Sequence, residues 1–435
     1  MRRKTRRAPF PRPLHRLGRW QVYSVFWPGA VVVGVLSVLF VLGADLAERT
    51  FVDGVQRWPW LPLVLTPLGL GLIAWMTVRF APVSRGSGVP QVVATLRAPS
   101  GGRLRERMLT IKVALSKIVL TILGLACGAS VGCGGPMVHV GAAVMFSLGR
   151  WARFSGRSLQ RSLIVAGGAA GIAAAFSTPL AGVAFAVEEM SRPYGNRIGS
   201  KVLISVVLAG GAALLLLGDY DYFGSVEAGM DIVGGGYVIL GCGVVGGILG
   251  GAFARGMITG SALMTPLYAR APVRTAMACG LLVALIGLAS GGSVYGTGYQ
   301  EAYAILHGGA PADFLYPLWK MLATLASGLS GIPGGIFAPA LSTGAGLGVV
   351  IAEFFTSVPL TAVVLLAMTG YFSGIVRTPI TAVVIVMEMT NNLDMAIPLM
   401  AVSWIATGVS RWICPRSVYD AMADVFLKAS GFRRR

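Results

Sequence analysis

The chain has 435 residues, of which 55% are hydrophobic and 12% are charged, and it contains 60 glycines. A soluble domain carries about 25% charged residues, so the composition excludes a soluble domain and predicts a membrane protein. The net charge of +19 does not indicate nucleic-acid binding, because the lysines and arginines gather at both ends and in short loops. Those are the places where membrane topology and anionic lipid headgroups favour them.

The basic N-terminal tail spans residues 1–19 and is interrupted by prolines. It is too basic and too proline-rich to be the flank of a cleaved signal peptide. The positive-inside tendency predicts that it lies in the cytoplasm, together with a basic C-terminal tail at residues 426–435. Two cytoplasmic termini require an even number of crossings. The expected location is the plasma membrane, which in a bacterium is the inner membrane.

Long apolar runs recur between the tails, at residues 27–42, 109–127, 203–217 and 361–387. A hydrocarbon core of about 30 Å needs a helix of roughly 20 apolar residues. The recurrence therefore predicts an all-α protein that crosses the membrane several times, rather than a protein with a single anchor.

An internal repeat relates the two halves of the chain. Residues 178–183 match residues 378–383, and both segments run on to a glutamate, at Glu188 and Glu388. The same offset of 200 residues relates Ser130 to Ser330 and the glycine pair 134–135 to 334–335. We expect a first transmembrane repeat at 20–220, a loop at 221–234 and a second transmembrane repeat at 235–425. Duplicated transporters bind substrate between their halves at interrupted helices, although a duplication can also be purely architectural.

Four segments combine glycine or small polar residues with a following proline and an apolar helix, at residues 86–90, 132–136, 177–179 and 334–339. Proline suits the first turn of a helix, and glycine lets successive N–H groups converge. Inside a bilayer such groups must be buried by protein or line a cavity. A small anion satisfies several of them at the positive end of the helix dipole. One such segment could be a packing kink, but four predict an anion pathway.

The sequence predicts no metal site, cofactor or enzyme activity. The five cysteines are widely spaced, contain no CxxC pair and are expected to be small core residues. Three histidines and the absence of a GxxxxGK[ST] loop leave no constellation for catalysis. A membrane enzyme or a non-conducting scaffold is therefore the weaker alternative class.

The segments above resemble the CLC family of chloride channels and proton–chloride exchangers. Residues 86–90 (GSGVP) are similar to the family's GSGIP element, residues 335–339 equal its GIFAP element, and residues 132–136 lie where it has GREGP. Residues 179–190 and 388–390 fit further shared segments. The resemblance implies two inverted-topology repeats of tilted and partial helices, and a homodimer with one pore per subunit. Nothing after residue 425 is long enough for an added domain, so the expected type is the prokaryotic one without CBS domains.

The resemblance also implies roles for individual residues. A central chloride site is implied at Ser87, Ile336, Phe337 and Tyr419, an inner site at Ser87 and Gly88, and an outer site at Cys133, Gly134, Gly135, Phe337 and Ala338. Serine at position 87 goes with chloride rather than nitrate, and with Tyr419 it argues against a fluoride exporter. Lys117 is implied to make the pore more positive, although a lysine near a helix end can also snorkel to the membrane surface.

The gating glutamate of the family is absent, because its position in GREGP is Gly134 and the preceding arginine is Cys133. We expect a passive, proton-independent chloride channel or uncoupled transporter. Glu189 aligns with a proton-carrying glutamate of the exchangers, so the rival is an antiporter that uses Glu189 and a non-standard second proton site. Alternatively, Glu188 and Glu189 form an ion-paired helix end with Arg192 and Arg197.

His139 is the substitute gate that the sequence offers near Gly134, since histidine titrates near neutrality. A hydrogen-bonded core histidine is the alternative interpretation.

Overall fold

The computed structural model describes residues 19–98, 102–154, 156–191, 199–218, 222–309, 314–355 and 357–429. Within these ranges the chain forms helices joined by short loops, and no β-strand. Most of the basic N-terminal tail, the last residues of the C-terminal tail, and Arg192 and Arg197 lie outside the described residues.

The first half of the chain contains a long first helix followed by shorter ones. Its elements are α1 (Arg19–Arg57), α2 (Leu61–Phe80), the 3-10 turn η1 (Pro82–Ser84), α3 (Val89–Arg97), α4 (Gly102–Met108), α5 (Ile111–Ala126), α6 (Gly134–Trp151), α7 (Arg157–Phe176), α8 (Pro179–Phe185), the π-helical turn η2 (Ala186–Met190) and α9 (Ser200–Leu217).

The second half begins with another long helix. Its elements are α10 (Ile232–Arg270), α11 (Pro272–Ala289), α12 (Tyr299–Leu306), α13 (Tyr316–Leu329), α14 (Phe337–Ala352), α15 (Leu360–Val376), α16 (Pro379–Met389), α17 (Ala396–Ile413) and α18 (Val418–Ala429). The apolar run 361–387 is thus two helices, because the chain breaks at Arg377 and Thr378 before Pro379 starts α16.

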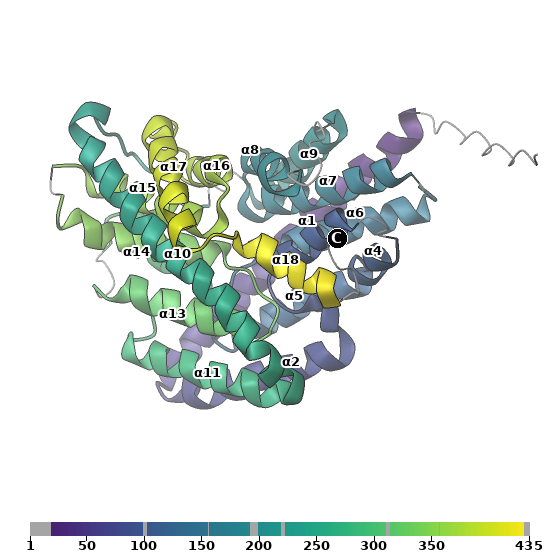
Figure 1. Cartoon of the computed structure of the whole chain (residues 1–435), viewed down its shortest axis with the longest axis horizontal. Helices are drawn as coiled ribbons and strands as arrows, with labels where there is room; N and C mark the ends of the chain where they lie inside the picture. Colours follow the sequence, from purple (N-terminus) through teal and green to yellow (C-terminus); the bar gives the residue numbers. More distant parts are fainter. Residues whose placement is uncertain are drawn as a thin grey trace, which may run out of the picture.

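The helices fit a membrane-spanning protein. Among the described residues, seven helices are long and apolar enough to cross a bilayer. A helix of 39 residues, the length of both α1 and α10, measures about 58 Å and must tilt within a core of about 30 Å. Figure 1 shows α10 running diagonally across the molecule. Large apolar side chains face outward, such as Leu39 on α1 and Leu215 on α9, as a lipid environment permits.

The two halves repeat the same helix order. α1 and α10 have equal lengths, as do α9 and α17 with 18 residues each. α6 packs on α7 as α14 packs on α15, and α1 packs on α9 as α10 packs on α17. The matching pairs are α1 with α10, α2 with α11, α3 with α12, α5 with α13, α6 with α14, α7 with α15, α8 with α16, and α9 with α17.

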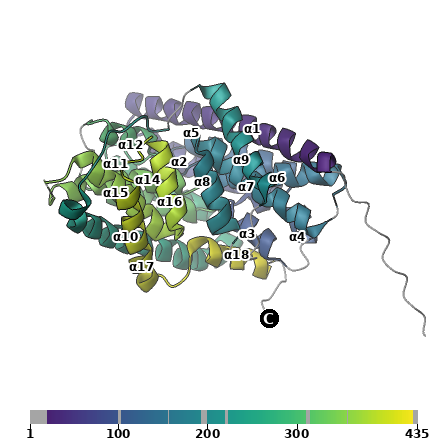
Figure 2. The ribbon, with the colours of Figure 1, turned by 90° about the horizontal axis from the view of Figure 1, so that it is seen from above.

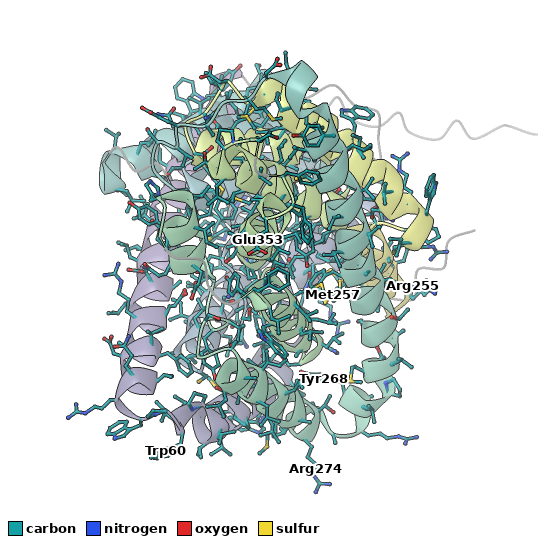
Figure 3. All side chains as sticks on the ribbon, turned by 90° about the vertical axis from the view of Figure 1, so that its left-hand side faces the viewer. Trp60, Arg255, Met257, Tyr268, Arg274 and Glu353 are labelled. Carbon is teal, nitrogen blue, oxygen red and sulfur yellow. The ribbon has the colours of Figure 1, made fainter. Side chains whose placement is uncertain are left out.

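The halves are related by an approximate two-fold axis, because some elements pack against their own counterparts. α8 packs on α16 and α2 packs on α11. In Figure 2, α8 and α16 lie side by side near the centre, while α1 and α10 lie on opposite sides. Figure 3 shows Trp60, just before α2, and Arg274, on α11, at the same end of the molecule. This arrangement is the expected pair of inverted repeats.

The offset between the repeats is not constant. It is 200 residues at the start of α8 and α16, where Thr178 and Thr378 share nearly the same backbone angles. α6 begins at Gly134 and α14 at Phe337, so the structural offset there is 203. The expected match of glycines 134–135 with 334–335 is therefore wrong by three residues. Glycine is so frequent in this chain that two glycine pairs matched in the wrong register.

Candidate functional site

Three of the expected helix starts meet at one junction, held by backbone hydrogen bonds between the loops that precede them. Gly132 and Gly335 exchange two bonds: each N–H donates to the carbonyl oxygen of the other, at 2.8 and 2.7 Å. The Gly86 N–H donates to the Ile332 carbonyl at 3.1 Å. The starts of α3, α6 and α14 are therefore fixed relative to one another.

The loop before α3 needs its glycines. Gly86 and Gly88 have φ values of +71° and +108°, a region that favours glycine. A Cβ on Gly88 would also lie 2.8 Å from the His139 Cβ and 2.9 Å from the Gly135 carbonyl oxygen. A Cβ on Gly135 would collide with the Ser87 hydroxyl. The loop thus brings the Ser87 hydroxyl against the first turn of α6.

Two buried hydroxyls without hydrogen-bond partners converge at this junction. The hydroxyl oxygens of Ser87 and of Tyr419, in the first turn of α18, are both buried and unsatisfied. The two hydroxyls lie near each other without meeting the geometry of a normal hydrogen bond. The Tyr419 ring lies 6.1 Å from the Phe337 ring. An unsatisfied buried hydroxyl costs about 1–3 kcal/mol. An anion between the two would accept hydrogen bonds from both.

Lys117 places a buried amino group beside the same loop. Its side chain is fully buried on α5, and Nζ donates to the Gly86 carbonyl oxygen at 2.9 Å. The alternative that this lysine snorkels to the surface is therefore wrong. Among the described ion pairs none involves Lys117. A buried ammonium without a counter-charge is costly, and an anion at the junction would stabilise the charged form of this lysine.

The start of α6 carries no acid and has no room for a side chain. A Cβ on Gly134 would lie 2.5 Å from Phe176 Cζ and 2.9 Å from Phe337 Cδ2. The ring centroids of Phe176 and Phe337 are 6.4 Å apart, in edge contact. Two aromatic rings therefore enclose the place where the family's glutamate would begin. No motif in the sequence pointed to Phe176, which ends α7.

The two candidate titratable groups have different surroundings. His139 is fully buried on α6, and its Nε2 donates to the Met108 carbonyl oxygen at 2.9 Å. This bond matches the core-histidine interpretation. Glu189 is 2% exposed within the π-helical turn η2, and it is close enough to the Tyr419 hydroxyl to interact with it electrostatically. π-helical turns are often found at functional sites.

The fourth expected helix start, before α8, already holds an anion from the protein. The Glu388 carboxylate accepts hydrogen bonds from the Leu180 and Ala181 N–H groups at 2.9 and 2.7 Å. Its repeat counterpart Glu188 accepts from the Ile380 and Thr381 N–H groups of α16, at 3.3 and 2.8 Å. The start of α8 is therefore not open to a transported anion.

Glu188 serves as this cap rather than as the expected partner of an arginine. A carboxylate at the end of one helix neutralises the N–H groups that begin the other, which is favourable at the positive end of a helix dipole. Each of the two helices thus caps the other across the two-fold axis.

Two cavities lie next to the junction, and different residues line each of them. The first, of about 490 Å³, is lined by Arg97, Arg377, Arg411, Pro415, Arg416, Ser417, Asp420 and Asp424. This basic cavity lies next to Tyr419 and can concentrate anions. The second, of about 770 Å³, reaches Cys133, Phe176 and Ala338 and is also lined by Asp45, Glu48, Asp53 and Glu301. We call it the acidic cavity.

Comparisons with known proteins agree with this architecture. A family model described as voltage gated chloride channel matches residues 69–411. The H⁺/Cl⁻ exchange transporter ClcA of Yersinia pestis is 26% identical over 422 residues, which cover 90% of this chain and 85% of that protein. ClcA of Vibrio cholerae is 28% identical over 425 residues, covering 92% and 88%.

A solved structure extends the likeness to the fold. The crystal structure of a slow cyanobacterial Cl⁻/H⁺ antiporter superposes with a TM-score of 0.83 at 24% identity, covering 94% of this chain and 99% of that one.

Proposed function

Because the chain belongs to the voltage-gated chloride channel (CLC) family and is a CLC-type chloride transporter, we propose that it carries chloride passively, without coupling to protons. The observation that carries this proposal is Gly134. The position has no carboxylate to compete with chloride or to bind a proton, and Phe176 and Phe337 fill the adjacent space. Transport then follows the electrochemical gradient alone.

We assign the residues of the junction to three chloride positions. The central position uses the hydroxyls of Ser87 and Tyr419 and the N–H groups of Ile336 and Phe337. The inner position uses Ser87 and Gly88. The outer position uses the N–H groups at the start of α6 and α14, from Cys133, Gly134, Gly135, Phe337 and Ala338. The unsatisfied hydroxyls and the buried charge of Lys117 support this assignment.

Anion release is compatible with such a pathway. Backbone dipoles and hydroxyls hold an anion without a full cation in contact with it, so binding stays weak enough for rapid exit. The basic cavity next to Tyr419 supports an entrance on that side. The acidic cavity reaches Cys133 and Ala338 and supports a second entrance on the other side.

A proton-coupled antiporter is the alternative. Both ClcA relatives described above are named H⁺/Cl⁻ exchange transporters, and Glu189 is buried within electrostatic reach of Tyr419. Such an antiporter would use Glu189 together with a second, non-standard proton site. His139 is a poor second site, because its Nε2 is bound to a backbone carbonyl.

Flux measurements on the purified protein in liposomes separate the two. Vesicles with equal chloride on both sides are given a pH gradient, and chloride and proton movement are recorded together. Valinomycin and equal potassium on both sides hold the membrane potential at zero. Passive transport then predicts no net chloride movement, because neither a chloride gradient nor a potential drives it. Reproducible uphill chloride movement driven by the pH gradient would overturn the passive model. ClcA of Vibrio cholerae, named as an exchanger, serves as the positive control.

We further propose a homodimer with one pore per subunit, repeats at residues 20–220 and 235–425, and both termini in the cytoplasm of a bacterium. Light scattering of the detergent-solubilised protein tests the dimer. Labelling of single cysteines at positions 4 and 428 in intact cells and in inverted vesicles tests the orientation. Labelling from outside intact cells would contradict it.

A further inference from the structure

The loop before α3 has a structural counterpart before α12. Gly296, Thr297 and Gly298 repeat the pattern of Gly86, Ser87 and Gly88, and both outer glycines again have positive φ, +66° and +76°. α12 follows Gly298 as α3 follows Gly88. Helices α3 and α12 are a matched pair of the two repeats, so Thr297 is the counterpart of Ser87.

The same correspondence holds for the buried lysines. Lys320 on α13 lies seventeen residues before the first residue of α14, and Lys117 lies seventeen residues before the first residue of α6. Lys320 is fully buried, and its Nζ donates to the Gly296 carbonyl oxygen at 3.1 Å. Lys117 makes the equivalent bond to Gly86. Each repeat therefore contains a loop with a central hydroxyl and a buried ammonium on the first glycine.

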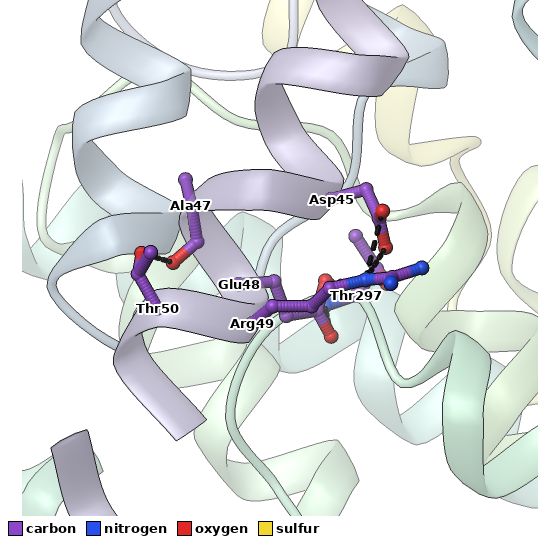
Figure 4. Close-up of polar contacts among 6 residues, drawn as sticks. All are labelled: Asp45, Ala47, Glu48, Arg49, Thr50 and Thr297. Atoms are coloured by element: carbon purple, nitrogen blue, oxygen red, sulfur yellow. Dashed lines mark hydrogen bonds and ion pairs between the residues drawn. The ribbon is translucent and has the colours of Figure 1, made fainter. Parts of the chain in front are cut away.

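The two loops differ in what occupies them. The Ser87 hydroxyl makes no hydrogen bond of normal geometry within the described residues, and its polar neighbour is the Tyr419 hydroxyl. The Thr297 N–H and hydroxyl both donate to the Glu48 carboxylate on α1, at 3.1 and 2.9 Å (Figure 4). An anion therefore sits on the loop of the second repeat, and that anion belongs to the chain.

We propose that the loop Gly296–Gly298 is a second anion-binding site, which Glu48 fills as a tethered anion and which accepts a halide when the Glu48 side chain is truncated. The donors are the Thr297 N–H and hydroxyl, with the positive charge of Lys320 behind them. The ligand class is a monovalent halide, because two hydrogen-bond donors and one buried cation suit a small single charge.

The site is open to anions from the acidic cavity. Thr297, Glu48 and Glu301 line that cavity, as do Cys133 and Ala338 at the starts of α6 and α14. A carboxylate fixed on Thr297 satisfies the donors and balances Lys320, so chloride is not retained in the cavity on its way to the junction. Glu48 thereby controls where an anion can bind along the route.

The other charged groups around the site do not replace Glu48. Glu301 on α12 interacts electrostatically with Lys320. On α1, Asp45 pairs with Arg49 at 2.9 Å (Figure 4), and Asp53 is exposed in the same cavity. Glu48 alone among these acids accepts the hydrogen bonds of Thr297 within the described residues. Asp53 is therefore a matched control that removes one charge from the cavity and leaves the loop occupied.

The test is bromide binding to the full-length protein, located by anomalous diffraction. Glu48→Ala removes both charge and volume, and bromide is expected within hydrogen-bond distance of the Thr297 N–H. Glu48→Gln removes the charge and keeps the volume, so the loop is expected to stay closed. Wild type and Asp53→Ala are expected to show no bromide on Thr297.

Bromide at Thr297 tests the second anion site, which rests on the proposed function, and bromide at Ser87 tests the chloride assignment itself. If Glu48→Ala shows bromide at Ser87 and none at Thr297, the inference is overturned and the chloride assignment at the junction stands. If bromide is missing at Ser87 in wild type, the chloride assignment fails, whatever happens at Thr297.

Thermal melts in detergent cover the case in which Glu48→Ala does not crystallise. A halide site that replaces Glu48 makes stability depend on chloride. At about 100 times its Kd, chloride should raise Tm by at least about 3 °C more in Glu48→Ala than in wild type or Asp53→Ala. Glu48→Ser serves as a second variant. An equal chloride response in all variants, or variants that remain unfolded at every chloride concentration, contradicts the site.

Discussion

The ring of Phe176, at the end of α7, lies where a side chain on Gly134 would extend from the start of α6. The contact joins the start of α6 to the end of α7, 42 residues further along the chain. It bears on the simplest experiment for this family, which is to restore the glutamate. A carboxylate at position 134 must displace Phe176 and Phe337 before it can reach an anion.

Gly134→Glu alone is therefore expected to destabilise the protein. Overpacking a core typically costs about 1–3 kcal/mol. The double variant Gly134→Glu/Phe176→Ala makes room for the side chain and should slow chloride efflux near neutral pH. Lowering the pH protonates the carboxylate, removes its negative charge and should restore the rate. Chloride efflux from liposomes across a pH series measures this, with Phe176→Ala as the control. A pH-independent rate in a folded double variant would show that position 134 does not face the pathway.

The hydroxyls of Ser87 and Tyr419 should contribute measurably to chloride binding. Removing one of them in Ser87→Ala or Tyr419→Phe deletes one hydrogen bond to the anion, worth about 1 kcal/mol or roughly a fivefold increase in Kd. Because neither hydroxyl makes a hydrogen bond of normal geometry to the protein, neither variant should lower Tm in chloride-free buffer. Isothermal titration with chloride gives the Kd. Unchanged affinity in both variants would remove these hydroxyls from the site.

Replacing Lys117 tests the buried charge. Lys117→Met keeps most of the side-chain volume and removes the positive charge. Chloride affinity should fall by at least about tenfold, because a unit charge within about 12 Å contributes about 1.4 kcal/mol or more at an effective dielectric constant near 20. Lys112→Met is the control, because Lys112 is exposed on the same helix. If the two variants bind chloride equally well, the charge of Lys117 does not act on the anion.

The reciprocal caps of α8 and α16 predict a stability effect without a transport effect. Glu388→Gln weakens the hydrogen bonds from Leu180 and Ala181, and Glu188→Gln does the same at α16. Each change should lower the free energy of unfolding by about 1–3 kcal/mol. Thermal melts in detergent measure it, with the exposed Glu353→Gln as the control (Figure 3). Chloride Kd should not change. A large loss of chloride affinity in either variant would mean that these helix starts belong to the pathway.

The sequence predicted the fold class and the three helix starts that meet, because proline and glycine have strong local preferences at such positions. It could not predict which starts are free. Glu388 lies about two hundred residues from the N–H groups that it caps, and only the two-fold packing of α8 on α16 brings them together. The frequent glycines also caused the two repeats to be matched three residues out of register at Gly134.

The equivalence of Ser87 and Thr297 was not visible in the sequence for a related reason. The two glycine-flanked triplets are short, and the offset between them differs from the offset at α8 and α16. Their equivalence depends on positive backbone angles and on lysines from other helices. Tertiary contacts of this kind leave no local sequence pattern.

The paired bonds of Gly132 with Gly335 have an evolutionary consequence. A residue that bonds to its own counterpart across an axis makes the contact that two identical subunits make when they insert in opposite orientations. Fusion of two such genes would free the copies to diverge, while the residues on the axis stayed constrained by each other. Away from the axis, one copy could keep its loop free to bind a transported ion. In the other copy, an acidic side chain of the same chain could come to fill the equivalent loop.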